Sequence, residues 1–203
     1  MKLVCVGRNY AKHAEELRNE VPAEPVLFIK PDSALLPPGH DFYLPDMDSA
    51  IHYEAELVVR IDKPAKHVEE RFAHRYYSQV TVGLDFTARD LQQRLKEKGL
   101  PWEKAKSFDG AAFLGAWQPI AELKNWPQTS FQLFKNETEV QQGYSDHMLH
   151  GVDSLIAYIS RFFTLKTGDL VFTGTPAGVG PLAIGDYLCL RLEEKTVGQL
   201  HVR

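Results

Sequence analysis

The segment Ile51–Ile61 is the clearest β-strand of the chain, because apolar and polar side chains alternate along it. Its polar face carries two acidic residues, Glu54 and Glu56, together with His52. Residues two apart in a strand lie roughly 7 Å apart at the backbone, so the two carboxylates can converge on one ion. A solvated strand face explains the same pattern. The apolar face, which we expect to pack into the core, consists of Tyr53, Ala55, Leu57 and Val59.

Asp85 is a third acidic residue that favours a metal site. It ends the apolar run Val80–Leu84, where burying an unpaired charge would be costly. It could cap the following helix, or it could complete a site made only of oxygen atoms. Such a site suits Mg²⁺, Mn²⁺ or Ca²⁺ better than Zn²⁺, which usually draws His or Cys. The sequence therefore predicts a hard divalent cation at Glu54, Glu56 and Asp85.

Short strands outnumber helices along the rest of the chain, and two of them follow Gly-Asp turns at Gly168-Asp169 and Gly185-Asp186. This pattern predicts a β-rich α+β fold, in one domain over residues 1–203, and not the regular alternation of a doubly wound sheet. The expected strands are Leu3–Val6, Val26–Lys30, Gln79–Phe86, Leu170–Thr173, Tyr187–Leu192 and a hairpin of Ser130–Asn136 with Glu139–Gln142. The expected helices are Tyr10–Arg18, His67–Tyr77, Thr87–Lys98 and Val152–Phe163.

Composition narrows the class of protein. The formal net charge of −4 argues against a nucleic-acid binder, which needs a basic face. No apolar run approaches the roughly 18 residues of a membrane helix. The two cysteines, Cys5 and Cys189, lie in apolar stretches, so we expect both to be reduced core residues. The first residues read as a strand without a targeting segment, so we expect a cytoplasmic protein.

Several short motifs lie in order over nearly the whole chain. They are Gly7-Arg8-Asn9-Tyr10 with His13, Phe28-Ile29-Lys30-Pro31, His52-Tyr53-Glu54-Ala55-Glu56, Leu84-Asp85-Phe86-Thr87-Ala88-Arg89-Asp90, Leu100-Pro101-Trp102, Lys106-Ser107-Phe108 and Thr173-Gly174-Thr175-Pro176-Ala177-Gly178-Val179-Gly180. In this order and spacing they resemble the fumarylacetoacetate hydrolase superfamily, in particular its short branch of acylpyruvate hydrolases and oxaloacetate-processing enzymes. The resemblance implies a mixed β-sandwich roll of the C-terminal-domain type, a homodimer, and Mg²⁺ or Mn²⁺ at Glu54, Glu56 and Asp85.

The resemblance also implies catalytic roles that the residues alone leave open. Most lysines are solvated, but the family places the lysine matching Lys106 in the site, where it stabilises negative charge. His13 and Glu16 are three apart in a helical stretch and share a face. They are either a surface pair or, as in hydrolases of the family, a pair that activates water. Because Tyr10–Arg18 is short and polar, we expect it to act as a lid over bound substrate.

The remaining candidates would bind the substrate. Basic residues would neutralise an anionic ligand, a glutamine would lie near it, and a glycine-rich loop, Thr173–Gly180, would bind its carboxylate through a hydroxyl and backbone N–H groups. Each also has an ordinary structural explanation, such as a surface charge or a tight turn. The candidates are Arg8, Lys30, Arg89, Gln92 and Thr175.

These features predict an enzyme for small 2-oxo acids that works through an enolate stabilised by the metal ion. The first hypothesis is acylpyruvate hydrolysis, in which His13 and Glu16 activate water and pyruvate and a carboxylic acid are released. The alternatives are oxaloacetate decarboxylation or keto–enol tautomerisation, which need Lys106 but no attacking water. Isomerisation or decarboxylation of 2-hydroxyhepta-2,4-diene-1,7-dioate is a further enzymatic alternative. A metal-dependent binding protein without catalysis is the non-enzymatic one.

Overall fold

The computed structural model describes residues 1–16 and 20–203 and contains one large mixed sheet. Its seven strands follow the order β2-β1-β11-β4-β5-β7, with β8 also paired to β5. β1 and β11 are parallel, whereas the other pairs are antiparallel. The strands are β1 (Lys2–Gly7), β2 (Val26–Pro31), β4 (Ala55–Ile61), β5 (Tyr77–Asp85), β7 (Ala112–Leu114), β8 (Gln118–Pro119) and β11 (Leu170–Phe172).

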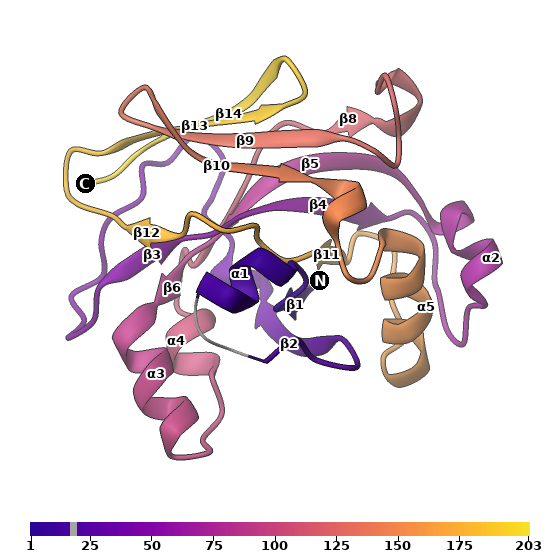
Figure 1. Cartoon of the computed structure of the whole chain (residues 1–203), viewed down its shortest axis with the longest axis horizontal. Helices are drawn as coiled ribbons and strands as arrows, with labels where there is room; N and C mark the ends of the chain where they lie inside the picture. Colours follow the sequence, from indigo (N-terminus) through magenta and orange to yellow (C-terminus); the bar gives the residue numbers. More distant parts are fainter. Residues whose placement is uncertain (17–19) are drawn as a thin grey trace.

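A four-stranded sheet of order β10-β9-β13-β14 lies over the large sheet (Figure 1). Phe131 and Leu133 of β9 share one hydrophobic core with Leu57 of β4 and Val82 of β5, so the two sheets form a sandwich. The expected hairpin is confirmed as β9 (Ser130–Lys135) and β10 (Thr138–Tyr144), and the other two strands are β13 (Tyr187–Leu192) and β14 (Lys195–His201). A small third sheet consists of β12 (Gly180–Pro181), β3 (Ile51–Tyr53) and β6 (Thr87–Ala88).

The helices lie at the two ends of the sandwich and near its centre (Figure 1). α5 buries Leu155, Ile156 and Ile159 on one face, as its periodicity predicts. None of the helices in the described part of the chain is long and apolar enough to cross a membrane. The α-helices are α1 (Ala11–Glu16), α2 (Glu70–Ala73), α3 (Arg89–Glu97), α4 (Glu103–Lys106) and α5 (Val152–Phe162). The 3₁₀ turns are η1 (Asp32–Ala34), η2 (His74–Tyr76), η3 (Ile120–Glu122) and η4 (Ser145–His147).

The strand-rich α+β fold is confirmed, but the single strand expected over Ile51–Ile61 is wrong. The strand is interrupted at Glu54, and the two parts, β3 and β4, belong to different sheets. The face of β4 that carries Glu56 and Val58 is buried as well, because Val58 packs in a second core cluster with Phe172. Alternation alone could not predict that both faces of the strand are covered.

Two further expectations about elements need correction, and a third lies partly outside the described residues. The helix expected over His67–Tyr77 is only the short α2 and η2, since Tyr77 already begins β5. The helix expected from Thr87 begins at Arg89, because Thr87 pairs with His52 in the third sheet. Of the helix expected over Tyr10–Arg18, the last two residues lie outside the described residues.

The two cysteines are free, but only Cys5 is a core residue. Cys189 is partly exposed because it lies on the face of β13 opposite to the buried Leu188 and Leu190.

The turn at Gly168-Asp169 ties the first strand to β11. Asp169 is buried and accepts hydrogen bonds from the backbone N–H groups of Lys2 (3.0 Å) and Lys166 (2.8 Å), and it also pairs with the Lys2 ammonium. Burial alone would raise the pKa of Asp169, but the contacts with Lys2 and Lys166 lower it below the ordinary value of 3.8.

Replacing Asp169 by asparagine is expected to lower the free energy of unfolding at pH 7 by about 1–3 kcal/mol. A lowered carboxyl pKa stabilises the fold above the unfolded value, and this contribution disappears as the pH falls from about 4 through the folded pKa. The deficit of Asp169→Asn, measured by denaturant unfolding, should therefore shrink in acid. Asp62→Asn, at an exposed position, is the control. An equal deficit at pH 7 and in acid would contradict the ionic role of Asp169.

Candidate metal centre and active site

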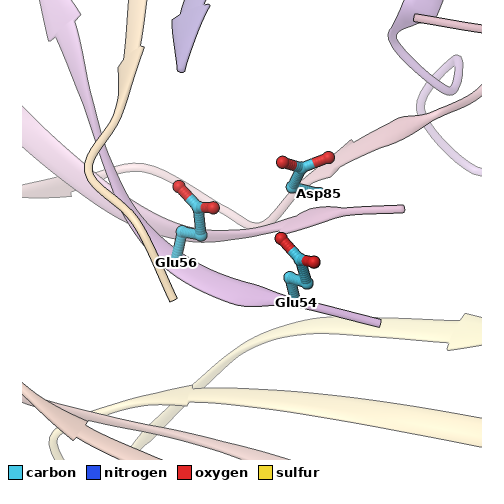
Figure 2. A group of neighbouring side chains, drawn as sticks. All are labelled: Glu54, Glu56 and Asp85. Atoms are coloured by element: carbon cyan, nitrogen blue, oxygen red, sulfur yellow. The ribbon is translucent and has the colours of Figure 1, made fainter. Parts of the chain in front are cut away.

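Three carboxylates converge at the end of strands β4 and β5 (Figure 2). Glu54 lies at the break between β3 and β4, Glu56 points from β4, and Asp85 ends β5. One oxygen atom from each side chain lies within 4.8 Å of those of the other two. All three are buried, and the Asp85 backbone N–H donates to the Glu54 carbonyl over 2.8 Å, so neighbouring strands hold the cluster.

This cluster fits a hard divalent cation. Burial, together with the nearby charges of Asp85 and Glu54, raises the pKa of Glu56 well above its ordinary value. Among the described residues, one oxygen of Glu56 accepts a hydrogen bond, from the Gly174 N–H at 2.7 Å. Asp85 Oδ1 is buried and makes an ion pair with Lys30 Nζ at 2.7 Å, but it accepts no hydrogen bond from the described part of the chain. A divalent cation would reduce the repulsion among the carboxylates and use these oxygens, and all-oxygen donors suit Mg²⁺ and Mn²⁺.

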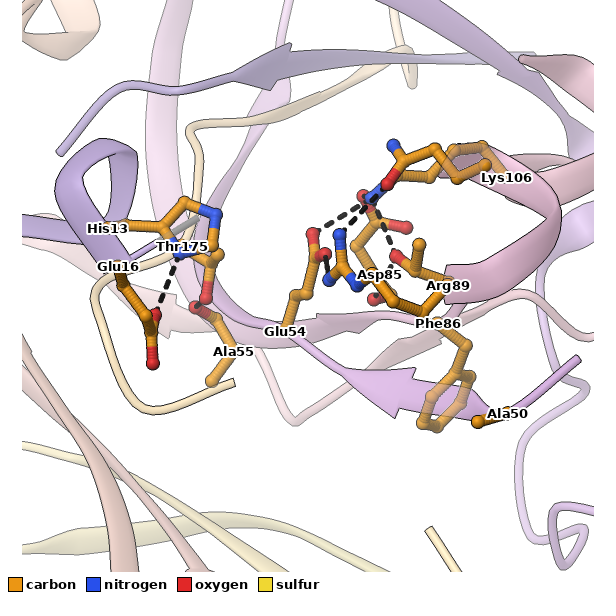
Figure 3. Close-up of polar contacts among 12 residues, drawn as sticks. His13, Glu16, Ala50, Glu54, Ala55, Asp85, Phe86, Arg89, Lys106 and Thr175 are labelled. Carbon is orange, nitrogen blue, oxygen red and sulfur yellow. Dashed lines mark hydrogen bonds and ion pairs between the residues drawn. The ribbon is translucent and has the colours of Figure 1, made fainter. Parts of the chain in front are cut away.

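Lys106, at the end of α4, is the main basic neighbour of the cluster (Figure 3). Its Nζ donates to Glu54 Oε2 (2.8 Å), Asp85 Oδ2 (2.8 Å) and Thr87 Oγ1 (2.7 Å). Burial alone would lower the pKa of Lys106, but Asp85 and Glu54 raise it above the ordinary value. Lys106 is therefore a cation at neutral pH, suited to stabilise negative charge.

Arg89, the first residue of α3, makes an ion pair with the other oxygen of Glu54 and donates to Gln92 Oε1 at 2.8 Å. Burial alone would raise the pKa of Glu54, but Lys106 and Arg89, followed by His13, hold it well below its usual range. Glu54 is thus ionised and oriented before any ligand binds.

Lys30 lies where a substrate cannot reach it, which differs from the substrate-binding role expected for it. Its side chain is fully buried, and its Nζ is 2.7 Å from Asp85 Oδ1. It also donates to the carbonyl groups of Lys106 and Ala111. Strand β2 therefore places Lys30 behind Asp85, where it offsets the charge of that carboxylate.

His13 and Glu16 on α1 contact each other across the cavity from Lys106 (Figure 3). His13 Nδ1 is 3.2 Å from Glu16 Oε2, and the Gly178 N–H donates to Glu16 Oε1 at 3.1 Å. Burial lowers the pKa of His13, and the charges of Glu54 and Glu16 offset only part of this effect. His13 is thus a neutral imidazole at pH 7, able to accept a proton, and Glu16 joins α1 to the glycine-rich loop.

A narrow cavity of about 40 Å³ connects these groups. Nine of the predicted site residues line it, while Glu16 reaches it through His13 and Lys30 does not. The lining also includes Phe28, Lys96 and Trp102, for which no site role was predicted. The nine are Arg8, His13, Glu54, Glu56, Asp85, Arg89, Gln92, Lys106 and Thr175.

The Thr175 hydroxyl is engaged in a different way from the one expected. It donates to the Ala55 carbonyl at 2.8 Å and accepts from Gln141 Nε2 at 2.9 Å, so its hydrogen is not directed at a ligand. Gln141, which sequence reasoning missed, also accepts from the Ala55 N–H (2.9 Å) and donates to the Pro176 carbonyl (3.0 Å). It belongs to β10 of the other sheet and fixes the backbone between Glu54 and Glu56, a role that no sequence motif marks.

Comparisons with known proteins agree with this geometry. Residues 2–203 match the family described as fumarylacetoacetate hydrolase, C-terminal. The chain is 45% identical to an oxaloacetate tautomerase of Escherichia coli over 193 residues, which cover 95% of this chain and 88% of that protein.

Solved structures of similar proteins share the fold. A fumarylacetoacetate hydrolase family protein from Yersinia pestis superposes with a TM-score of 0.95 at 42% identity, covering all of this chain and 93% of the other. A fumarylpyruvate hydrolase from Pseudomonas aeruginosa, in complex with Mn²⁺ and pyruvate, superposes with a TM-score of 0.91 at 36% identity, covering all of this chain and 88% of the other.

Proposed function

Since the chain belongs to the fumarylacetoacetate hydrolase C-terminal family, we propose that it is a metal-dependent enzyme for small 2-oxo acids whose main reaction is oxaloacetate keto–enol tautomerisation. The observation that carries the proposal is a buried trio of carboxylates, Glu54, Glu56 and Asp85, that shares one cavity with the cationic Lys106. The identity to an oxaloacetate tautomerase over most of its length favours this reaction over the acylpyruvate hydrolysis that the sequence motifs put first.

The charge of the cavity supports a dicarboxylate substrate. Four basic side chains line it, against the three carboxylates of the trio. Burial and the nearby charges of Arg8, Arg89 and Lys106 lower the pKa of Lys96, which shows how closely the positive charges gather. With a divalent cation bound, the lining carries an excess of three positive charges, which favours a dianion such as oxaloacetate. The basic residues are Arg8, Arg89, Lys96 and Lys106.

A divalent cation held by Glu54, Glu56 and Asp85 would act as a Lewis acid toward the 2-oxo group of the substrate. In the keto-forming direction the enol oxygen gives its proton to solvent water, carbon 3 takes a proton from a protein donor, and water restores the proton of that donor. Lys106 is the proton donor that we assign to carbon 3, since it is buried, cationic and lines the cavity. All three of its N–H groups donate to protein oxygens, two of them to Glu54 and Asp85, so ion binding by these carboxylates would compete for them and release Lys106.

Several finer statements are part of the same proposal. We expect Mg²⁺ as the ion used in the cell, with Mn²⁺ as an effective substitute, because both accept oxygen ligands. We also expect one catalytic domain over residues 1–203, a cytoplasmic location and a homodimer. Metal analysis of the purified protein and its mass in solution check the ion and the oligomeric state.

Acylpyruvate hydrolysis is a second candidate, and the His13–Glu16 pair is the observation in its favour. A neutral, buried imidazole held by a carboxylate is suited to take a proton from water. Tautomerisation needs no attacking water, so this pair would be dispensable for it. The fumarylpyruvate hydrolase of similar structure agrees with this second activity.

His13→Ala tests which reaction uses the pair. It is expected to lower acetylpyruvate hydrolysis by about 10²- to 10⁴-fold, because the general base is lost. Oxaloacetate ketonisation, followed by the loss of enol absorbance, should stay within about threefold, because transfer of the enol proton between oxygen atoms is fast and Lys106 remains. Both assays use enzyme saturated with Mn²⁺.

His74→Ala, at an exposed position on η2, serves as the matched control, and calorimetry verifies that both variants bind Mn²⁺ like the wild type. Equal losses in both assays would contradict the division of roles, and full retention of hydrolysis would remove His13 from that reaction. Absence of turnover by the wild type on both substrates and on 2-hydroxyhepta-2,4-diene-1,7-dioate would overturn the enzymatic proposal and favour a binding protein.

A further inference from the structure

A second, larger cleft lies beside the metal cavity. Its volume is about 360 Å³, against about 40 Å³ for the cavity. Three of the described residues line both spaces, Phe28, Trp102 and Lys106, so together they form the partition between them. These three residues therefore determine whether a ligand in the metal cavity can extend into the cleft.

Two of the three members of the partition are aromatic. The rings of Phe28 and Trp102 lie 6.1 Å apart at a tilt of 55°, and Lys106 Nζ is 5.1 Å from the centre of the Phe28 ring. Lys106 is itself part of the ion site, since two of its three N–H groups donate to Glu54 and Asp85. The ring pair is thus the part of the partition that can change without disturbing the ion site.

Trp102 is placed by the same turn that places Lys106. Its carbonyl accepts the N–H groups of Ala105 (2.8 Å) and Lys106 (3.0 Å), which begins helix α4. These are backbone bonds, so a shorter side chain at position 102 leaves the position of Lys106 intact. The indole is only half-buried, and its removal therefore costs less packing than the loss of a core aromatic residue would.

The two sides of the ring pair are lined by different groups. The cavity side carries carboxylates and basic groups, which suit the ion and an anionic substrate. The cleft side lacks the carboxylates of the trio, and the apolar Val26, Leu100 and Pro101 line it together with Glu103 and Ser107. An unbranched alkyl group attached to a 2-oxo acid would fit the cleft but would have to pass the rings to reach it.

We propose that the Phe28–Trp102 ring pair sets the upper limit of substrate length, restricting the enzyme to short 2-oxo acids and keeping longer alkyl chains out of the neighbouring cleft. The inference rests on the proposed function, because it assumes that a 2-oxo acid occupies the metal cavity. It identifies Trp102 as a specificity-determining residue, which acts by exclusion and takes no part in the chemical step.

The test is a calorimetric titration of the Mn²⁺-loaded protein with unbranched 2-oxo acids from pyruvate to 2-oxooctanoate, so that the readout is affinity and not turnover. The wild type is expected to bind the longest acid about tenfold more weakly than the shortest or worse. Trp102→Ala should bind the longest acid at least about tenfold more tightly than the wild type does, and pyruvate within about threefold, because the alkyl chain then enters the apolar cleft.

Leu100→Ala is the matched control, since Leu100 lines the cleft but not the metal cavity, and this variant should keep the wild-type length profile. Trp102→Leu is a milder second variant in case the alanine variant folds poorly, and it should shift the profile in the same direction. An unchanged profile in both Trp102 variants, or a wild-type affinity that does not depend on length, would overturn the role of the ring pair alone. Failure of every 2-oxo acid to bind the Mn²⁺-loaded wild type would overturn the proposed function and this inference with it.

Discussion

Lys106→Met is expected to lower the turnover of oxaloacetate by about 10³-fold or more, because it removes a buried cation that lines the cavity. Methionine has a similar length but neither charge nor transferable proton, so the variant isolates the ammonium group. The rate of enol loss at saturating Mn²⁺ measures the effect. The expected loss is in kcat more than in KM, since the group acts on charge that develops during the reaction.

The same substitution has a structural cost that must be separated from the catalytic one. It leaves Glu54 and Asp85 without one of their basic partners, and breaking a buried ion pair costs about 3–5 kcal/mol. The melting temperature of Lys106→Met in chelator should therefore fall, and Mn²⁺ should restore part of it. Lys104→Met, on the exposed side of the same helix, should change neither quantity. A folded, Mn²⁺-binding Lys106→Met enzyme with near-normal kcat would exclude Lys106 from the reaction.

Glu56→Gln is expected to weaken Mn²⁺ binding by about 10²-fold or more, equivalent to about 2.7 kcal/mol, and to abolish most activity at ordinary metal concentrations. Among the three carboxylates, Glu56 gives the cleanest test, since Glu54 and Asp85 also hold Lys106. In the described part of the chain, Glu56 accepts only from the Gly174 N–H. Calorimetric titration with Mn²⁺ measures the affinity directly.

The stability of Glu56→Gln without metal should change in the opposite direction. Burial and the neighbouring carboxylates raise the pKa of Glu56, so its ionised form destabilises the metal-free fold at neutral pH. Removing the charge should leave the melting temperature in chelator equal to that of the wild type or higher, while the increase on adding Mn²⁺ disappears. Glu103→Gln makes the same change at an exposed position near the site, and this variant should behave like the wild type both in chelator and with Mn²⁺. An undiminished Mn²⁺ response would show that Glu56 is not a ligand.

The acidic cluster was predictable because its signals are local. The spacing of Glu54 and Glu56 and the apolar run before Asp85 are properties of short segments, and strand pairing then brings their ends together. Their role as ligands stays a prediction. The two-sided burial of β4 was not predictable in this way, since it depends on which elements cover the sheet.

The role of a residue was harder to predict where it depends on which distant group its side chain contacts. Lys30 was expected to face the substrate, yet its neighbour is Asp85, which is distant in sequence. Gln141 lies in an ordinary hairpin, and only the packing of the two sheets brings it against Ala55 and Thr175. A sequence pattern marks a charged or polar side chain but does not say which distant backbone group it will contact.

The interruption between β3 and β4 at Glu54 has a consequence for how the activity of such a protein can change in evolution. Because the Asp85 N–H donates to the Glu54 carbonyl, the carboxylate trio belongs to the framework of the sheets. The His13–Glu16 pair instead belongs to a helix of six residues, held to the glycine-rich loop through the Gly178 N–H. In the proposed function, ion binding and water activation thus belong to separate parts of the molecule, so that changes confined to α1 would alter hydrolysis without rebuilding the sheets that hold the carboxylates.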